Sequence, residues 1–291
     1  MNVVKFTGGL GNQMFYYVLY RRFQKLNGNS SVVANLDFYS KASIDFELLD
    51  VFFNTNQLLN IDKSGIEKKY RKLNKFGDVV FRGHVPYLDK LVYGEKEAYV
   101  YDENVFALRN SLLDGYWQSY RYLEGIEDEI RNELSFSLND SGLKEFARKI
   151  RENGKDVVSV HVRRGDYISL SKIYGGICTE EYYQKAIEFF TEKHDKLTFV
   201  FFSNDIEWVK KNMSSEDYEC IFVEESMFDD YKDWYDMYLM SICKHNIIAN
   251  STFSWWGAWL NDNKDKVVYA PKTWVHTYSA PDICPPNWIR A

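Results

Sequence analysis

The chain has 291 residues, of which 45% are hydrophobic, and its formal net charge is −6. This length and composition suit a globular protein with one large domain or two of average size. The acidic balance argues against non-specific binding to nucleic acid, and no apolar run approaches the roughly 18 residues that a membrane-spanning helix requires.

The N-terminus predicts a strand, a glycine-containing loop, a helix and a second strand. Residues 3–6 form the strand, Thr7-Gly8-Gly9-Leu10-Gly11-Asn12-Gln13 the loop, and 32–36 the second strand. Between them an apolar stripe indicates a helix that Gly28 ends. The first glycines follow Met1 too closely for a signal peptide. Together with the lack of a stem or anchor, this favours a cytoplasmic protein of bacterial origin.

The middle of the chain, from residue 40 to about 150, shows short apolar pieces and charged stretches, with breaks at Gly65, Gly77, Gly83, Gly94, Gly115 and Gly125. We expect mostly helices there, including a helical stretch from Glu127 to Ile150 with a break at 135–141. Asn153-Gly154-Lys155-Asp156 is polar and turn-forming, and it precedes a strong strand. We therefore place a domain boundary there, giving domains 1–153 and 154–291.

The second half alternates strands with helices. Strand-like runs occur at 157–162, 198–202, 220–223, 246–249 and 267–270. Helical segments lie between most of them; Thr179 can cap a helix over 180–193, and Ser203 one over 205–212. Continuously apolar strands separated by helices indicate a parallel sheet covered on both faces, which is an α/β domain of the nucleotide-binding type.

Polar clusters follow three of these strands, where open α/β sheets bind their ligands. They are His161-Val162-Arg163-Arg164-Gly165-Asp166-Tyr167, Ser203-Asn204-Asp205 and Asn250-Ser251-Thr252-Phe253-Ser254-Trp255-Trp256-Gly257. Two arginines with hydroxyls and N–H groups at helix starts make an anion site that suits a diphosphate. The alternative is that the arginines pair with nearby carboxylates and the serines only cap helices.

No metal site or cofactor is predicted. The chain has no Asp-x-Asp sequence, and its histidines show no close pairing; His84, His194 and His276 read as ordinary surface or loop residues. The four cysteines lack Cys-x-x-Cys spacing and are expected to be free thiols. Arginine charge in place of Mg²⁺ is the simpler explanation of phosphate binding.

The N-terminal loop offers a second interpretation. Gly9-Leu10-Gly11-Asn12-Gln13-Met14 is a partial dinucleotide-binding pattern, and Asp37 ends the second strand where a ribose-binding acid would lie. An NAD(P)-dependent oxidoreductase is thus an alternative, although the third glycine of the pattern is missing. A simple tight turn and a glycan-binding protein that uses the many aromatic side chains are the other readings.

The same segments resemble the α-1,2-fucosyltransferases, the inverting enzymes of glycosyltransferase family 11. Four stretches carry the resemblance, and the C-terminal Pro285-Pro286-Asn287-Trp288-Ile289 is similar as well. They are Gly8-Gly9-Leu10-Gly11-Asn12-Gln13-Met14-Phe15, His161 to Tyr167, Phe202-Ser203-Asn204-Asp205, and Asn246 to Leu260.

The resemblance implies a GT-B fold, with two Rossmann-like domains facing across a cleft. Domain 1–153 would lie on the acceptor side, 154–291 would bind GDP-β-L-fucose without a metal, and the last residues would be able to pack back on the first domain. The implied reaction moves L-fucose to O2 of a terminal β-galactose of an oligosaccharide, as in lipopolysaccharide or capsule synthesis. The implied location is the cytoplasm or the inner face of the membrane.

The resemblance also implies roles for individual residues. Arg163 would hold the β-phosphate, Arg164 and Asp166 would brace each other, and Asp236 would read the guanine N1 and N2 hydrogens. Arg163 and Asp166 are the catalytic candidates. The implied donor-binding set is His161, Arg163, Arg164, Ser203, Asn204, Asp205, Asp236, Ser251, Thr252, Phe253 and Ser254, joined by Gly11, Asn12 and Gln13 facing the fucose or the acceptor.

A general base for the acceptor hydroxyl is not identified by these motifs. Asn12 and Gln13 cannot accept a proton, because amides do not titrate. The base would then be Asp37, Asp166 or a carboxylate within residues 85–115. Alternatively, departure of the leaving group runs ahead of attack and little base is needed.

Overall fold

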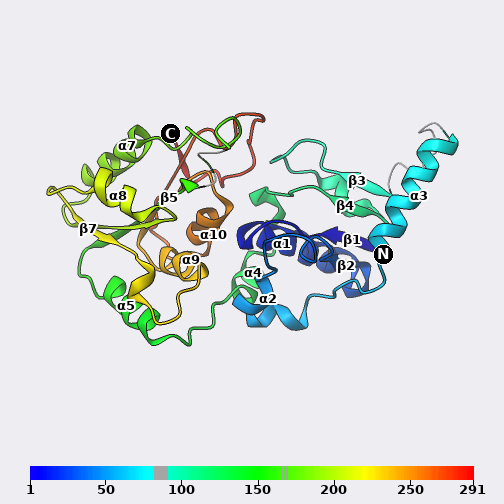
Figure 1. Ribbon diagram of the computed structural model, residues 1–291, viewed down its shortest axis with the longest axis horizontal. Helices are drawn as coiled ribbons and strands as arrows, with labels where there is room; N and C mark the ends of the chain where they lie inside the picture. Colours follow the sequence, from blue (N-terminus) through cyan, green and yellow to red (C-terminus); the bar gives the residue numbers. More distant parts are fainter. Residues whose placement is uncertain (82–90, 166, 168–169) are drawn as a thin grey trace. The chain divides into compact units, whose positions relative to one another are not determined.

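The computed structural model describes residues 1–81, 91–165, 167 and 170–291. The chain forms two compact units: Met1–Phe136 with Ala280–Ile283, and Ser137–Ser279 with Cys284–Ala291. Figure 1 colours the first unit from blue to green and most of the second from green to red. Within the described residues, no helix is long and apolar enough to cross a membrane.

The first unit is built on a parallel sheet with strand order β2-β1-β4-β3. The apolar Val3 and Val4 of β1 are fully buried between their neighbouring strands. The elements of this unit are β1 (Asn2–Lys5), α1 (Leu10–Asn27), β2 (Val32–Asn35), α2 (Leu48–Val51), α3 (Ile66–Phe81), β3 (Val92–Gly94), β4 (Leu112–Asp114) and α4 (Glu127–Glu133). Helix α1 joins β1 to β2 and ends at Gly28, which adopts a φ of 86°.

The middle of the chain differs from the sequence prediction. We expected mostly helices between 40 and 150, yet β3 and β4 lie there as two members of the first sheet. Each strand is only three residues long, so neither shows the alternation that reveals a longer strand. The helical prediction for Glu127 to Ile150 is confirmed, including its break, by α4 and α5 (Ser141–Arg151).

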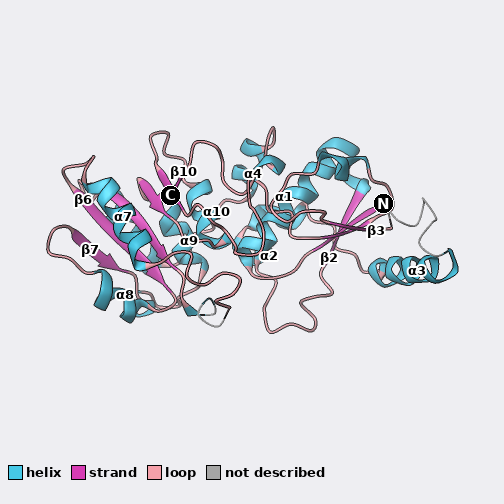
Figure 2. Ribbon diagram, turned by 90° about the horizontal axis from the view of Figure 1, so that it is seen from above, coloured by secondary structure: helices cyan, strands magenta, loops and turns pink. Residues whose placement is uncertain are grey.

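The second unit holds a six-stranded parallel sheet with the order β10-β9-β8-β5-β6-β7. Helices α7 and α8 cover one face, and their apolar side chains form a core cluster with the strands, while α9 and α10 lie toward the other (Figures 1 and 2). The elements are β5 (Asp156–Val162), α7 (Glu180–Thr191), β6 (Leu197–Ser203), α8 (Ile206–Met213), β7 (Glu219–Phe222), α9 (Trp234–Ser241), β8 (His245–Ile247), α10 (Thr252–Leu260), β9 (Val268–Ala270) and β10 (Ile289–Arg290).

The boundary between the units lies after Phe136 instead of after residue 153. Helix α5 belongs to the second unit, because Phe146 packs edge-on against Phe228 and Arg151 donates to the hydroxyl of Tyr238 at 3.0 Å. The α/β class and the Rossmann-like character expected of both parts are confirmed by the two parallel sheets.

Strand order in the second unit fixes where a ligand can bind. The chain runs outward from β5 through β6 to β7, and then β8 pairs with the opposite side of β5. The reversal between β5 and β8 is a topological switch point, at which the carboxyl ends of two neighbouring strands leave an opening for a ligand. The polar segments after these two strands therefore meet at one edge.

Candidate active site

His161 lies at the carboxyl end of β5 and is 4% exposed. Its Nδ1 has no hydrogen-bond partner among the described residues, and its ring centre lies 5.9 Å from that of Phe253. Burial, and to a lesser extent the charge of Arg163, lowers the pKa of the imidazole to about 3. The ring is therefore neutral at physiological pH and lines the opening without adding charge.

The two arginines after β5 have different surroundings. Arg164 donates from Nε to the Asp205 carboxylate at 3.1 Å, and its guanidinium carbon lies 3.7 Å from the ring centre of Trp208. Its backbone N–H donates to Asn204 at 3.0 Å. Arg164 thus ties the loop after β5 to the start of α8. Asp166, the partner that we expected for Arg164, lies outside the described residues. The carboxylate that the structure shows paired with Arg164 is Asp205.

Arg163 is half-buried, and its neighbours differ from those of Arg164. Its guanidinium carbon lies 5.8 Å from the ring centre of Tyr167, whose hydroxyl donates to the carbonyl of Asn250 at 2.9 Å. The loop after β5 is thereby attached to the loop after β8. Since Asn250 leads into α10, Arg163 belongs to the segment that lies beside the start of that helix.

The residues after β6 form hydrogen bonds that fix the start of α8. Asp205 is the N-cap of α8 and accepts from the backbone N–H of Trp208, whereas Ser203 accepts from the N–H of Asp205 at 3.0 Å. The cap that we assigned to Ser203 is therefore supplied by Asp205, two residues further along the chain. Asn204 and Gly165 touch: a Cβ on Gly165 would lie 2.1 Å from Nδ2 of Asn204.

At the start of α10, two serines form hydrogen bonds within the helix start, and the two residues between them are partly exposed. Ser251 caps the helix by accepting from the N–H of Phe253 at 3.3 Å, and Thr252 and Phe253 are half-buried in the first turn. Ser254 is fully buried and donates to the carbonyls of Ala249 and Ser251. We expected Ser254 to contact a diphosphate, but the geometry assigns its hydroxyl to the loop itself.

Asp236 lies in the first turn of α9 and carries a buried oxygen, Oδ1, that has no partner among the described residues. Burial raises the pKa of this carboxyl to about 7; a hydrogen bond from Tyr231 opposes the rise, and the charges of Asp233 and Glu225 add to it. Helix α9 packs closely on α10, since a Cβ on Gly257 would lie 2.9 Å from Cβ of Met240. Oδ1 of Asp236 is a hydrogen-bond acceptor for which the described residues supply no donor.

The glycine loop of the first unit is a separate cluster. Gly11 is buried in α1, and Gln13 is fully buried, with Nε2 donating to the carbonyls of Gly8 and Asp45 and Oε1 accepting from Glu47 and Leu48. These bonds favour a structural role for Gln13 over the ligand contact that we expected. Asn12 is half-buried and accepts from Gln118 at 2.9 Å.

The chain matches known proteins along its whole length. The model described as "Glycosyl transferase family 11" matches residues 97–291. The α-1,2-colitosyltransferase of Escherichia coli is 33% identical over 303 residues, which cover 99% of this chain and 98% of the relative. This chain belongs to glycosyl transferase family 11. It is an enzyme, a glycosyltransferase, and the oxidoreductase alternative is inconsistent with that family.

Further relatives of this glycosyltransferase include the O-antigen biosynthesis glycosyltransferase WbnK of Escherichia coli, which is 30% identical with 98% of each chain covered. Galactoside α-(1,2)-fucosyltransferase 1 of Ateles belzebuth is 28% identical over 51% of this chain and 42% of its own length. Among solved structures, FUT1 of Arabidopsis thaliana in complex with GDP has a TM-score of 0.48 and 11% identity, covering 92% of this chain and 70% of that chain. NodZ α-1,6-fucosyltransferase has a TM-score of 0.47 and 13% identity, covering 89% and 92%.

Two histidines of this glycosyltransferase lie together at the opposite edge of the second sheet. Asp156, His194 and His245 place a carboxylate oxygen and two imidazole nitrogens within 4.8 Å of one another, a proximity that the sequence spacing does not reveal. However, Nδ1 of His245 accepts from the N–H of Val267, which leaves the ring proton on Nε2 instead of a free lone pair. Lys244 also pairs with the Asp156 carboxylate. The arrangement favours an internal network over a cation site.

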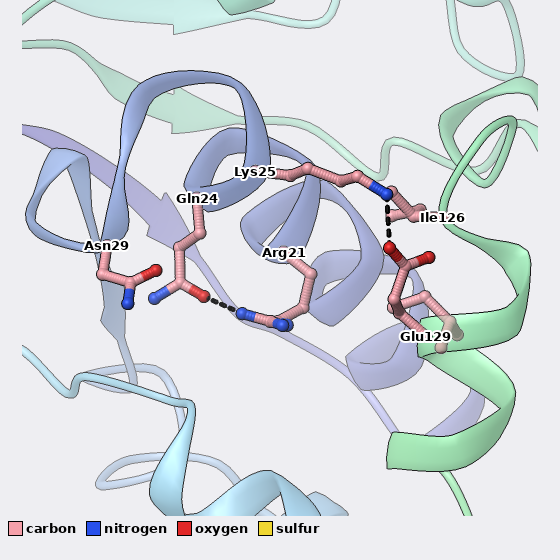
Figure 3. Close-up of a pocket in the computed structure, with 7 residues that line it drawn as sticks. Arg21, Gln24, Lys25, Asn29, Ile126 and Glu129 are labelled. Carbon is pink, nitrogen blue, oxygen red and sulfur yellow. Dashed lines mark hydrogen bonds and ion pairs between the residues drawn. The ribbon is translucent and has the colours of Figure 1, made fainter.

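A pocket in the first unit lies between the end of α1 and α4, away from the carboxyl edge of its sheet (Figure 3). Its charged side chains are already paired: Arg21 with Gln24 and Glu133, and Lys25 with Glu129. These bonds leave the pocket without an evident charge for a ligand. It carries none of the residues that the family resemblance implies.

Sequence reasoning missed one conspicuous group in the first unit. Glu95 follows β3 at the carboxyl edge of the sheet, and its carboxylate accepts from the N–H groups of Tyr116 and Trp117. Trp117 has a φ of 55°, and its buried indole N–H lacks a partner among the described residues. Only the broad range 85–115 pointed to this carboxylate, because nothing in the sequence aligns β3 with β4.

Proposed function

We propose that this glycosyltransferase moves L-fucose from GDP-β-L-fucose to O2 of a terminal β-galactose, with inversion at the anomeric carbon and without a metal ion. The α-1,2 linkage is supported by two relatives whose names carry it, the bacterial colitosyltransferase and the galactoside fucosyltransferase. The oligosaccharide acceptor and the role in lipopolysaccharide or capsule synthesis are supported by the O-antigen biosynthesis relative.

The observation that carries the proposal is the position of Arg163, on the segment that Tyr167 attaches to the loop before α10. Arg164, the next residue, pairs with Asp205 and stacks on Trp208. A guanidinium beside a helix N-terminus is suited to a diphosphate, because both the positive charge and the free N–H groups attract its oxygens. Arg163 is therefore the group assigned to the β-phosphate.

The chemistry follows from where charge develops. As the bond between the sugar and the phosphate breaks, negative charge grows on the departing GDP oxygen, and a fixed guanidinium stabilises this transition state more than the ground state. Asp236 complements the other end of the donor, since its Oδ1, which has no partner in the described part of the chain, can accept from guanine N1–H or N2–H. His161, which is neutral at physiological pH, lines the opening beside Phe253.

A second donor is favoured by one observation. The E. coli relative that is 33% identical over nearly the whole chain is a colitosyltransferase. Colitose is fucose without its 3-hydroxyl, so both sugars present the same anomeric carbon to Arg163. GDP-colitose is therefore the alternative donor.

The experiment tests GDP-β-L-fucose and GDP-colitose as donors. Each is offered lactose, lacto-N-biose or N-acetyllactosamine as the acceptor, in buffer containing a chelator. We expect an α-1,2-linked product, identified by NMR, from GDP-β-L-fucose. Arg163→Ala should lower kcat by about a hundredfold, which is the effect of losing one preorganised hydrogen-bond donor at the departing phosphate.

Arg148→Ala is the matched control, because among the described residues this exposed arginine pairs with Glu145 on α5 and with Glu152 at the end of the same helix. It should leave kcat unchanged. Absence of transfer from either donor contradicts the proposed function, and full activity of folded Arg163→Ala contradicts the role of Arg163. Loss of wild-type activity in the chelator would contradict the metal-independent mechanism.

A further inference from the structure

Helix α3 carries a row of lysines on the face opposite to the one that packs on the first sheet. Tyr70 is buried against Val3 of β1, and Ile66 packs on the same apolar cluster. The opposite face carries exposed lysines spaced four and three residues apart, which places them in one row along the helix. This lysine face consists of Lys68, Lys72 and Lys75 in the row and Lys69 beside it. Figure 1 shows α3 in cyan, close to the N-terminus of the chain.

The lysine face lacks the ion pairs that exposed lysines form elsewhere on the molecule. On α7, for example, Lys185 pairs with Glu181 at 2.6 Å, one helical turn away. On α3 such a pair joins Arg71 to Glu67 at 2.8 Å, but no carboxylate of the described residues pairs with the lysine face. Like charges four residues apart on a helix repel each other. An anionic surface lying against this face would therefore stabilise it.

Positive charge is concentrated around this helix in a chain that is acidic overall. Residues 63–75 contain six lysines and arginines and one glutamate, whereas the whole chain has a formal net charge of −6. Basic residues gathered on one helix create a local positive potential. An anionic partner is thus attracted to this helix and not to the molecule as a whole.

Exposed apolar side chains lie next to the lysine face. Leu73, one helical turn after Lys69, is 41% exposed. The hydroxyl of Tyr70 donates to the carbonyl of Met1 at 3.1 Å, so Met1, which is 43% exposed, lies beside α3 as well. Lysines combined with exposed aliphatic side chains are typical of helices that lie on a lipid surface, where the cations meet headgroups and the apolar groups enter the acyl boundary.

A membrane suits this helix better than a nucleic acid does. Proteins that bind single strands offer aromatic rings on which bases stack, but Tyr70, the aromatic residue within 66–75, is buried. A nucleic acid also requires a broadly basic surface, and the rest of this acidic chain would repel it. A flat membrane needs to touch only the one helix.

We propose that the lysine face of α3, together with Leu73 and Met1, docks this enzyme reversibly on an anionic phospholipid bilayer. The ammonium groups contact headgroup phosphates, and the two apolar side chains enter the boundary of the acyl region. The helix lies along the surface and does not cross the membrane. This docking does not depend on the donor or the acceptor proposed above.

Sedimentation of the purified chain with lipid vesicles tests the docking. Vesicles of phosphatidylcholine and phosphatidylglycerol in equal parts supply the negative headgroups, and vesicles of phosphatidylcholine alone are the neutral reference. We expect the chain to bind the anionic vesicles at least about tenfold more tightly than the neutral ones. Raising NaCl from about 0.1 M to about 1 M should release it, because the screening length shrinks from about 10 Å to about 3 Å.

Removal of charge from the lysine face should abolish most of this binding. One lysine near an anionic surface raises the partition coefficient about fivefold, so loss of three should weaken binding about a hundredfold. The variant that tests this is the triple Lys68→Gln, Lys72→Gln and Lys75→Gln. Arginine at the same three positions keeps the charge and should restore wild-type binding.

The matched control changes the net charge equally at another place. It replaces three exposed lysines of the second unit by glutamine, at Lys144, Lys211 and Lys264. This variant should bind the anionic vesicles as the wild type does. Because all the substituted lysines are exposed, each variant should keep the wild-type melting temperature, measured by circular dichroism.

Three results would overturn docking through the lysine face: no binding to anionic vesicles, equal binding to neutral ones, or an equal loss in the control variant. A labelled single-stranded oligonucleotide that bound through the same lysines as tightly as the vesicles would assign the face to nucleic acid instead. Self-association without vesicles that is lost in the triple glutamine variant would assign it to a second copy. Each of these outcomes leaves the proposed sugar transfer untouched, because transfer is measured with water-soluble acceptors.

Discussion

The proposed guanine contact of Asp236 would couple nucleotide binding to pH. In the unliganded enzyme its carboxyl has a pKa of about 7, because burial disfavours the charge. Guanine N1–H and N2–H are donors, so they select the ionised form. At a pH below 7, binding must first release a proton, and affinity should therefore improve as the pH rises through 7.

The prediction is an increase in GDP affinity of up to about tenfold per pH unit below pH 7, levelling off above it. Calorimetry at several pH values measures the dependence. Asp236→Asn should bind GDP more weakly and lose this component, and it also supplies the background from titration of the GDP phosphate. Asp233→Asn removes a neighbouring negative charge, so it should keep the dependence but shift its midpoint to lower pH. Identical pH curves for wild type and Asp236→Asn would exclude this role.

At the scale of elements, the loops after β5 and β6 form one interlocked structure. Gly165 lies against Asn204, and Asn204 accepts from the N–H of Arg164. A methyl group at 165 would lie 2.1 Å from Nδ2 of Asn204, so the amide would have to turn away and leave that N–H without its partner. The position of Arg164 and its neighbours would then be less well defined.

We expect Gly165→Ala to lower the free energy of unfolding by about 1 kcal/mol, the scale of one lost hydrogen bond, and to weaken GDP binding. Asn204→Ala should have a similar effect. The double variant should be less destabilised than the sum of the two, because the side chain that clashes is gone. Urea unfolding and GDP titration of all four proteins measure this coupling. Strictly additive losses would contradict the proposed contact.

Elements also show where sequence reasoning succeeded. The strands of the second sheet are apolar runs bounded by turns, and β5 and β6 are seven residues long, so their pattern is visible. The three-residue strands β3 and β4 carry too few residues for any period. Their strand character comes from pairing with each other and with β1, which local sequence does not encode.

At the scale of the whole molecule, the chain returns to its first unit after the second is nearly complete. Ala280–Ile283 belong to the N-terminal unit. Asp282 accepts from the N–H of Tyr101 through Oδ2 and from the N–H of Tyr120 through its carbonyl, both at 2.9 Å. The first unit is therefore completed by residues that follow it by more than a hundred positions.

We expect Asp282→Ala to lower the free energy of unfolding by about 1–3 kcal/mol, because the N–H of Tyr101 loses its acceptor. Asp282→Asn retains an acceptor oxygen and should recover most of the loss. Asp229→Ala, an exposed aspartate of the second unit, should change stability by less than about 0.5 kcal/mol. Urea denaturation of the three variants checks the order. Equal stability of Asp282→Ala and wild type would show that this segment does not fasten the first unit.

The sequence by itself determined the α/β class, five of the six strands of the second sheet and the polar segments at their carboxyl ends, because parallel strands bring such ends to one edge whatever the details of packing. Only the tertiary structure decided which of those polar groups already have hydrogen-bond partners within the protein. It ties Ser254 and Gln13 into hydrogen bonds with the backbone, pairs Arg164 with Asp205 and Trp208, and gives Oδ1 of Asp236 no partner among the described residues. The reason is that hydrogen-bond partners and burial arise from segments far apart in the chain, which no local pattern records.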